Sequence, residues 1–243
     1  MPYRGVFFEK NQPFHIVSRG VEERKIFERE EDCYRFVFQI YAANVGKPGF
    51  NLWKKDIIKV ARTILEGEEV SSKFIIKEHS PLVDILDWSL VMTHFHFFLV
   101  PNIENIVPVF IKKLNGGFAK YFNLKYKREG TLFGRRYKGI PVMSEFQSDA
   151  VSRYVNIINP LDVYQPGWRE DGLGNLDEAF EFLLNYQFSS FPDKAGRRNS
   201  KITAPKEILE KYCATSYLSK EEYEKFVKDF IKKKSSSQHL FLE

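Results

Sequence analysis

Two histidines spaced two residues apart, His94 and His96, are the side chains of this sequence best suited to bind a metal ion. The segment His94–Pro101 predicts a strand, and strand side chains alternate between faces, so both imidazoles point the same way. Phe95 and Leu99 then point to the opposite face, toward a core. Two neutral imidazoles on one face can chelate a divalent ion. From the spacing alone, a ligand pair and two histidines on an exposed strand are equally good interpretations.

The remaining histidines and the cysteines carry no comparable pattern. His15, His79 and His239 are interpreted as ordinary surface or satisfied residues. Cys33 and Cys213 are isolated and form no CxxC pair, which indicates two reduced thiols in a cytoplasmic protein.

Tyr154 is the second candidate for chemistry, on a helix expected from Glu145 to Ile158 and ended by Asn159-Pro160. A phenol with a pKa near ~10 needs a metal ion or a basic neighbour before it can attack phosphorus. Asn156 or Asn159 offers an amide oxygen as a further ligand, which Mg²⁺ accepts. Taken alone, the position of Tyr154 on an apolar stripe favours a place in the core.

Positive charge is concentrated in one part of the chain. The formal net charge is +5, and the window from Lys112 to Lys138 holds nine basic residues and one acid, Glu129. A solvated helix face usually mixes both signs, so the window favours a polyanionic partner, and we favour nucleic acid. We expect phosphate or base contacts from Lys112, Lys113, Lys120, Arg135, Arg136, Tyr137 and Lys138.

The elements that must position these residues follow the order β-α-β-β-α-β-α. Strands are expected at 14–18, 84–92, 94–101 and 132–143, and helices at 30–45, 106–127 and 145–158. This is the order of the α+β ferredoxin-like (split βαβ) fold, an antiparallel four-stranded sheet with helices packed on it. Inside the second helix, Gly116-Gly117 suggests the close approach of another backbone.

Residues 1–160 form the expected catalytic core, with an insert at about 46–80 that holds a helix near 54–66. Residues 161–243 form an expected, mainly helical C-terminal extension, with helices near 177–187 and 219–233. The end of the chain, from Lys232, is expected to be a frayed tail. Apolar runs are too short to span a bilayer and the N-terminus has no secretion signal, so we expect a cytoplasmic protein with no membrane partner.

Taken in order along the chain, several segments resemble the single-tyrosine HUH transposases of the insertion-sequence type, and among them the REP-associated tyrosine transposases. The resemblance runs through most of residues 10–190. It is carried by His15–Gly20, Ile26-Phe27, Met92–Val100, Leu114–Asn123, Gly130–Lys138, and Tyr154 with Asn159-Pro160.

The resemblance implies a DNA transposase or nickase that acts on single-stranded or hairpin DNA. It implies that His94 and His96 bind Mg²⁺ or Mn²⁺, with Asn159 as third ligand. It implies further that Tyr154 cleaves the strand, leaving a 5′-phosphotyrosyl bond and a free 3′-OH, and that a 3′-OH attacks this bond to rejoin DNA. No small-molecule cofactor is implied, and a homodimer is allowed because some relatives exchange helices between two chains while others act as monomers.

One spacing departs from the family pattern. There the asparagine before proline follows the tyrosine by four residues, whereas Tyr154 and Asn159 are five apart. One extra residue rotates Asn159 by about 100° on an ideal α-helix, which leaves the third ligand open. A π-bulge would restore the alignment. Tyr137 is the reserve candidate for the nucleophile.

Two other function classes remain open from the sequence. A non-catalytic (domesticated) DNA- or RNA-binding module would use the same fold, and the altered Tyr154–Asn159 spacing would support it. A metal-dependent hydrolase with a water nucleophile would use His94 and His96 and would need carboxylates, of which Asp84 and Asp87 are the only nearby ones.

Overall fold

The computed structural model describes residues 6–49, 54–134, 136–213 and 218–236. Its centre is a four-stranded antiparallel sheet in the order β4-β5-β1-β6. The strands are β1 (Phe14–Arg19), β4 (Val83–Val91), β5 (His94–Pro101) and β6 (Lys138–Pro141). With one helix after β1 and one after β5, this order is the ferredoxin-like arrangement, and the expected fold class is confirmed.

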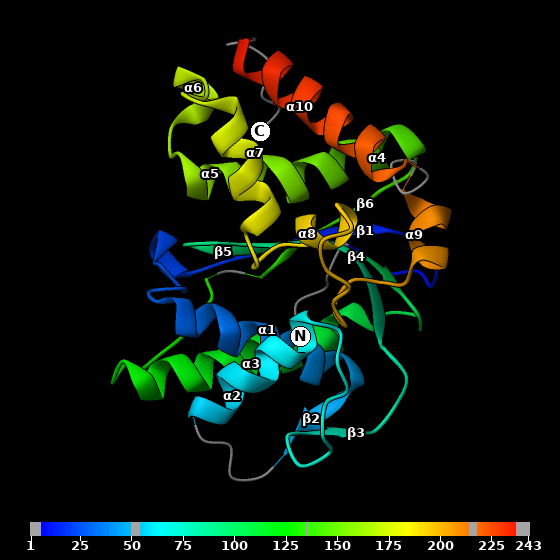
Figure 1. Cartoon of the computed structure of the whole chain (residues 1–243). Helices are drawn as coiled ribbons and strands as arrows, with labels where there is room; N and C mark the ends of the chain where they lie inside the picture. Colours follow the sequence, from blue (N-terminus) through cyan, green and yellow to red (C-terminus); the bar gives the residue numbers. More distant parts are fainter. Residues whose placement is uncertain (1–5, 50–53, 135, 214–217, 237–243) are drawn as a thin grey trace.

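Two helices cover the first face of the sheet, α1 (Glu30–Val45) and α3 (Val107–Lys125) (Figure 1). Their apolar side chains and those of alternate strand residues form one core, with rings such as Phe36, Phe95 and Phe118 in mutual contact. At Gly117 of α3, an added Cβ would lie 2.4 Å from the Gln39 side-chain nitrogen of α1. The expected close approach is therefore made by a side chain and not by a backbone.

The insert forms a small unit beside α1. Strands β2 (Gly46–Pro48) and β3 (Ile75–Lys77) pair with each other, and α2 (Lys54–Leu65) packs against α1. A 3₁₀ turn, η1 (Val21–Glu23), follows β1.

The strand expected over 132–143 is shorter in the structure. Only β6 is a ladder, while Phe133 makes an isolated bridge to Gly20. The backbone of Leu132 and Gly134 still bonds to Val21 and Arg19, at 2.9 Å in each case. The apolar pattern thus marked a segment that follows the sheet edge without continuous pairing.

A long helix crosses the second face of the sheet. It consists of α4 (Glu145–Arg153), a π-helical turn η2 (Tyr154–Ile158) and α5 (Asn159–Tyr164). The expectation that the helix ends at Asn159-Pro160 is wrong. The widened π turn precedes Pro160, so the proline is tolerated where a regular α-helix would break.

The C-terminal extension packs on this helix and the same face. It contains α6 (Trp168–Asp171), α7 (Leu176–Asn185), α8 (Phe191–Lys194), α9 (Lys206–Tyr212) and α10 (Lys220–Ser236). The helices expected near 177–187 and 219–233 are confirmed, but α10 continues to Ser236, past the start of the segment expected to fray; the rest of that segment lies outside the described residues. Figure 1 shows the sheet between α1–α3 on one side and α4, α5, α7 and α10 on the other. Within the described ranges, no helix is long and apolar enough to cross a membrane.

Candidate functional site

Strand alternation places the two paired histidines on the second face of the sheet. Phe95 and Phe97 are fully buried in the core on the first face. His94 and His96 point the other way, with ring centroids 4.9 Å apart. On β1, the residue directly opposite His96 is Val17.

His15 completes a cluster of three imidazoles, which corrects its interpretation as an ordinary residue. Its Nε2 lies 3.0 Å from Nδ1 of His96, and the two rings stack with centroids 5.3 Å apart. His15 has the same strand parity as Val17, and β1 pairs with β5, so the two histidines are diagonal neighbours. The position of His15 on its strand could be read from the sequence, but its proximity to His96 follows only from the register in which β1 pairs with β5.

Burial keeps these imidazoles neutral. Desolvation lowers the pKa of His15 to about 4 and that of His94 to about 4, where the charges of Arg19 and Arg169 add to the effect. The same desolvation, with the neighbouring histidines and arginines, holds the pKa of His96 well below its ordinary value. Neutral imidazoles keep a lone pair for a cation near neutral pH.

Tyr154 lies over this cluster. Its ring centroid is 5.5 Å from that of His96 and 5.9 Å from that of His15, edge-on in both cases. The buried neighbours Val155 and Ile157 hold η2 against the protein interior. The structure therefore brings the tyrosine and the histidine strand together, as the fold was expected to do.

The π turn gives the five-residue spacing between Tyr154 and Asn159 a structural explanation. The backbone N–H of Asn159 donates to the carbonyl of Tyr154, five residues earlier. Five residues thus close one turn of this helix, where four would close an α-helical turn. The extra residue is absorbed and does not rotate Asn159 a further 100° from Tyr154.

The two asparagines of this helix have different surroundings. The amide of Asn156 donates to Asp87 and accepts from Ser190 Oγ at 2.6 Å, so its hydrogen bonds are used within the fold. Asp87 also pairs with Lys194 at 2.7 Å, which commits this carboxylate to a buried ion pair. Both side-chain amide atoms of Asn159, Nδ2 and Oδ1, are instead buried without a hydrogen-bond partner in the described part of the chain.

The donor atoms present fit a divalent cation. Nε2 of His96 is, like the Asn159 amide, buried and without a hydrogen-bond partner among the described residues. Within the same residues, no group of three His, Cys, Asp or Glu side chains is placed to hold a metal ion. A site here would therefore combine His94 and His96 with an amide oxygen, for which Asn159 is the available donor.

A cleft of about 520 Å³ opens beside Tyr154. Its wall is made by β1, β5, β6, α4, η2 and the end of α10, and none of the described residues that line it is a carboxylate. Phe146, at its edge, is 79 % exposed. Its cationic lining residues are Arg19, Lys138, Arg153 and Lys234.

Of the residues predicted to contact nucleic acid, the structure brings Lys138 to this cleft. Arg136 is exposed on the segment before β6, and Tyr137 is half-buried against the core, 6.2 Å from the Phe8 ring. Arg135 lies outside the described residues. The stacking role predicted for Tyr137 is therefore disfavoured by its packing.

The lysines of α3 lie elsewhere. Lys112, Lys113 and Lys120 belong to the helix on the first face, opposite the histidine cluster (Figure 1). The structure does not bring them to the cleft. Charge counting along the chain could not separate them from Lys138, because the window folds onto both sides of the sheet.

Besides His15 and Lys234, four residues of the site were missed by the sequence reasoning, and three of these four are arginines. Arg19 and Arg153 line the cleft, and Phe146 stands exposed at its edge. Arg169 lies with its guanidinium carbon 5.5 Å from the centroid of the Tyr154 ring. None of the three arginines falls in the basic window, so only the fold could gather them.

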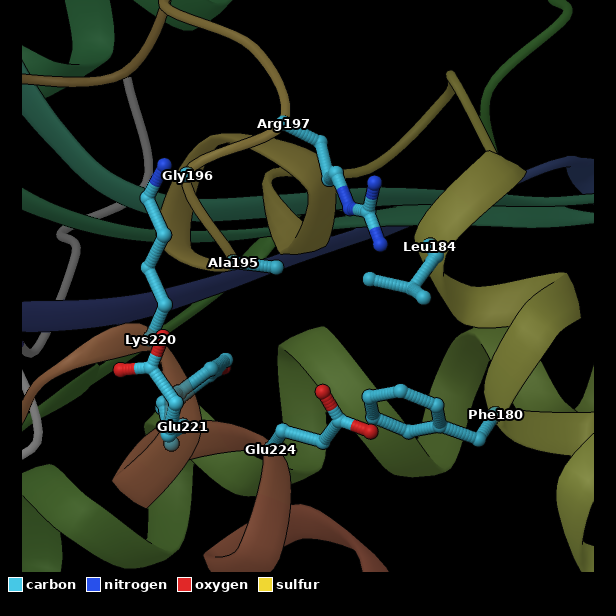
Figure 2. A pocket seen from close by; sticks show the side chains of 9 residues that line it. Phe180, Leu184, Ala195, Gly196, Arg197, Lys220, Glu221 and Glu224 are labelled. Carbon is cyan, nitrogen blue, oxygen red and sulfur yellow. The ribbon is translucent and has the colours of Figure 1, made fainter.

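A second cavity, of about 380 Å³, lies between α7, the end of α8 and α10. Figure 2 shows Arg197 and Lys220 at this cavity together with Glu221 and Glu224. Both signs of charge meet here, and although Tyr223 lines the cavity, no histidine does so among the described residues. The cleft beside Tyr154 is therefore the candidate functional site.

No protein-family model and no curated protein matches this sequence. Among solved structures, the chain is similar to a REP-associated tyrosine transposase bound to a REP hairpin. The sequence identity is 13 %, the TM-score is 0.46, and the match covers 81 % of this chain and 87 % of that one. A likeness of this degree leaves the function to be argued from the site.

Proposed function

We propose that this protein is a metal-dependent enzyme that cleaves and rejoins single-stranded DNA through Tyr154. The observation that carries the proposal is one juxtaposition. The Tyr154 ring lies 5.5 Å from the ring of buried His96, which forms a neutral pair with half-buried His94, in a cleft where every charged side chain among the described lining residues is cationic. A nucleophile, a cation site and an anion-binding wall are the three parts that phosphodiester transfer needs.

His94, His96 and Asn159 would hold a Mg²⁺ or Mn²⁺ ion. When bound, such an ion polarises a phosphoryl oxygen and stabilises the negative charge of the transition state. The protein's contribution is to keep the imidazoles neutral by burial and to keep the amide oxygen of Asn159 without an internal partner. A further hydrogen bond, between Nδ1 of His94 and the Thr93 hydroxyl at 2.9 Å, orients the first imidazole.

The cleavage step conserves atoms and electrons. The Tyr154 oxygen forms a bond to phosphorus while the bond from phosphorus to the 3′-oxygen breaks. The phenol gives up its proton and the departing oxygen gains one, which yields a 5′-phosphotyrosyl adduct and a 3′-OH. Attack of a 3′-OH on the adduct reverses these bond changes, releases the tyrosine and rejoins DNA.

The cleft walls support a single strand as substrate. Arg19, Lys138, Arg153 and Lys234 supply cations for backbone phosphates. Phe146 offers an exposed ring at the edge, and an unpaired base has a free face for stacking on such a ring.

The rival functions lose their supporting observations. The altered Tyr154–Asn159 spacing, which would favour a non-catalytic module, is absorbed by the π turn. An RRM-like mode needs an open sheet face, but helices cover both faces here. A hydrolase with a water nucleophile would need a free carboxylate near the histidines. Asp87 is bound to Lys194, and Asp84 lies opposite Val100, at the other end of β5 from His94.

A covalent-capture assay tests the proposal. The protein is incubated with labelled single-stranded hairpin DNA from the sequence flanking its gene, with Mn²⁺ or EDTA, and denatured. We expect a metal-dependent adduct that Tyr154→Phe and His94→Ala abolish. Tyr164→Phe is a matched control on the same helix, since its hydroxyl bonds, among the described residues, to Glu178 alone, at 3.4 Å.

Each other outcome has a defined meaning. An adduct that persists in Tyr154→Phe would reassign the nucleophile, and Tyr137→Phe would be examined next. Tight DNA binding without an adduct across a set of hairpins would support the non-catalytic module instead.

A further inference from the structure

Arg169 is placed beside the nucleophile by an element outside the sheet. The chain leaves α5, turns at Pro166-Gly167 and begins α6, which carries Arg169 back toward Tyr154. Gly167 adopts a left-handed conformation, with φ of +85°, that other residues rarely adopt. The turn thus depends on a glycine, and its result is a guanidinium 5.5 Å from the Tyr154 ring centroid.

Asp162 fixes the orientation of this guanidinium. Nε of Arg169 donates to Oδ1 of Asp162 at 2.9 Å, and a second nitrogen donates to Oδ2, which makes a two-point contact. The indole N–H of Trp168 donates to the same Oδ1 at 2.9 Å, so the carboxylate is itself held. A guanidinium is a planar fork of donors, and a two-point contact on one edge sets the direction of the others.

The charge of Arg169 acts on the proposed site. The Arg169 side chain interacts with the Tyr154 side chain by a hydrogen bond. Its positive charge also contributes, after burial and Arg19, to lowering the pKa of His94. Burial acts against its own charge, but Asp162 outweighs this and raises the pKa of Arg169. The side chain is therefore a permanent cation beside the Tyr154 ring.

We infer that Arg169, oriented by Asp162, binds a non-bridging oxygen of the phosphate that Tyr154 attacks. This inference rests on the proposed function and adds to it a specific phosphate-binding residue. As the tyrosine–phosphorus bond forms and the bond to the 3′-oxygen breaks, negative charge gathers on the non-bridging oxygens. A preorganised guanidinium at that place stabilises the transition state more than the ground state.

Substitution on both partners tests the contact. Adduct formation is timed in single-turnover experiments with DNA that carries either an ordinary phosphodiester or an uncharged methylphosphonate at the cleaved position. The two methylphosphonate diastereomers are measured separately, because the two oxygens have different surroundings. The proteins are wild type, Arg169→Ala, Arg169→Lys and Asp162→Asn, with Arg197→Ala as a matched arginine control at the second cavity (Figure 2).

With ordinary DNA, we expect Arg169→Ala to form the adduct on the order of 10²-fold more slowly, while Arg197→Ala matches wild type. With the methylphosphonate diastereomer in which methyl replaces the oxygen that Arg169 contacts, we expect wild type and Arg169→Ala to differ by less than about tenfold, since the contacted oxygen is gone. Asp162→Asn keeps the cation but loosens it, so its rate should lie between those of wild type and Arg169→Ala.

The contrary outcomes are separable. An Arg169→Ala rate equal to wild type, or an equal loss with all three DNAs, would overturn this inference and leave Tyr154 chemistry intact. If Arg169→Ala does not fold, Arg169→Lys supplies the same comparison, because an ammonium cannot make the two-point contact. If wild type forms no adduct with any hairpin, both the proposed function and this inference are overturned.

Discussion

The ion pair between Asp87 and Lys194 is expected to hold the Tyr154 helix onto the sheet. Asp87 lies on β4, and its carboxylate receives hydrogen bonds from Lys194 of α8 at 2.7 Å and from Asn156 of η2. Lys194 also donates to Ser152 of α4 at 3.0 Å. Three segments distant in sequence therefore meet at one buried carboxylate.

Substituting Lys194 by methionine should leave Asp87 charged and unpaired in the interior. The side chains of Lys194 and Asp87 are 5 % and 0 % exposed, so solvent cannot replace the lost partner. At an effective dielectric constant of ~20, their attraction at this distance is about 6 kcal/mol before desolvation is subtracted. Breaking such a pair from one side reduces the free energy of unfolding by about 3–5 kcal/mol. For a chain of this length, that loss lowers Tm by roughly 10 °C.

Urea unfolding followed by circular dichroism measures this loss. Lys201→Met is the control, because Lys201 pairs with a Glu69 side chain that is 80 % exposed, and its loss should be below about 1 kcal/mol. The double variant Asp87→Asn with Lys194→Met removes both charges and should recover about half of the loss. A single variant no worse than the control, or a double variant worse than the single one, would refute the assignment of a buried charge pair.

Three further outcomes follow from the structure. The double variant Lys138→Gln with Arg153→Gln should reduce the slope of log affinity for single-stranded DNA against log salt by about 1.4. The control Lys112→Gln with Lys120→Gln should leave this slope unchanged. Equal slopes for the two double variants would show that the cleft does not contact DNA. Mn²⁺ at 100 times its Kd should raise the free energy of unfolding by ~2.7 kcal/mol in wild type and leave His96→Ala unchanged, as thermal melts would show. Burial acts to raise the pKa of Asp32, but hydrogen bonds from Lys125, Tyr126 and Tyr121 outweigh it and hold this pKa below its ordinary value. Its stabilisation is thus present above pH ~4 and lost as the pH falls through the lowered pKa, so Asp32→Asn should destabilise the protein by about 2–3 kcal/mol at pH 6 and by less at pH 3. Urea midpoints at both pH values check this, and an equal difference would show that ionisation is not involved.

Strand alternation carried most of what the sequence could predict. The pattern of His94 to Pro101 separates a packed face from a chemical face, and the structure has both faces as expected. The same rule applied to β1 would have placed His15 with His96, but only once β1 and β5 were known to be neighbours in register. Local periodicity determines which face a residue takes, whereas pairing determines which residues share it.

The charge pattern of the sequence was a weaker guide, because a basic residue can either stabilise the fold or contact a ligand. Within the basic window, Lys125 lies 2.5 Å from Asp32 and Arg128 lies 2.7 Å from Asn123, so both serve the fold. Among the window's predicted contacts that the structure describes, Lys138 is the one that lines the cleft, beside Arg19 and Arg153 from outside the window. Packing between distant segments brings these cations together, and their spacing along the chain does not predict that they meet.

The π turn is a local irregularity of the helix that positions the residues of the proposed chemistry. A π-helical turn is less favourable than an α-helical one and persists where the surroundings determine it. Here Asn156 is held by Asp87 and Ser190 while Pro160 cannot donate to the helix, so the widened turn is fixed from both sides. The consequence is that Tyr154 faces the imidazoles while Asn159, one turn on, keeps an unbonded amide in the interior. A buried side-chain amide without a partner destabilises a fold, and in the function proposed above its oxygen would serve as the third ligand of the cation.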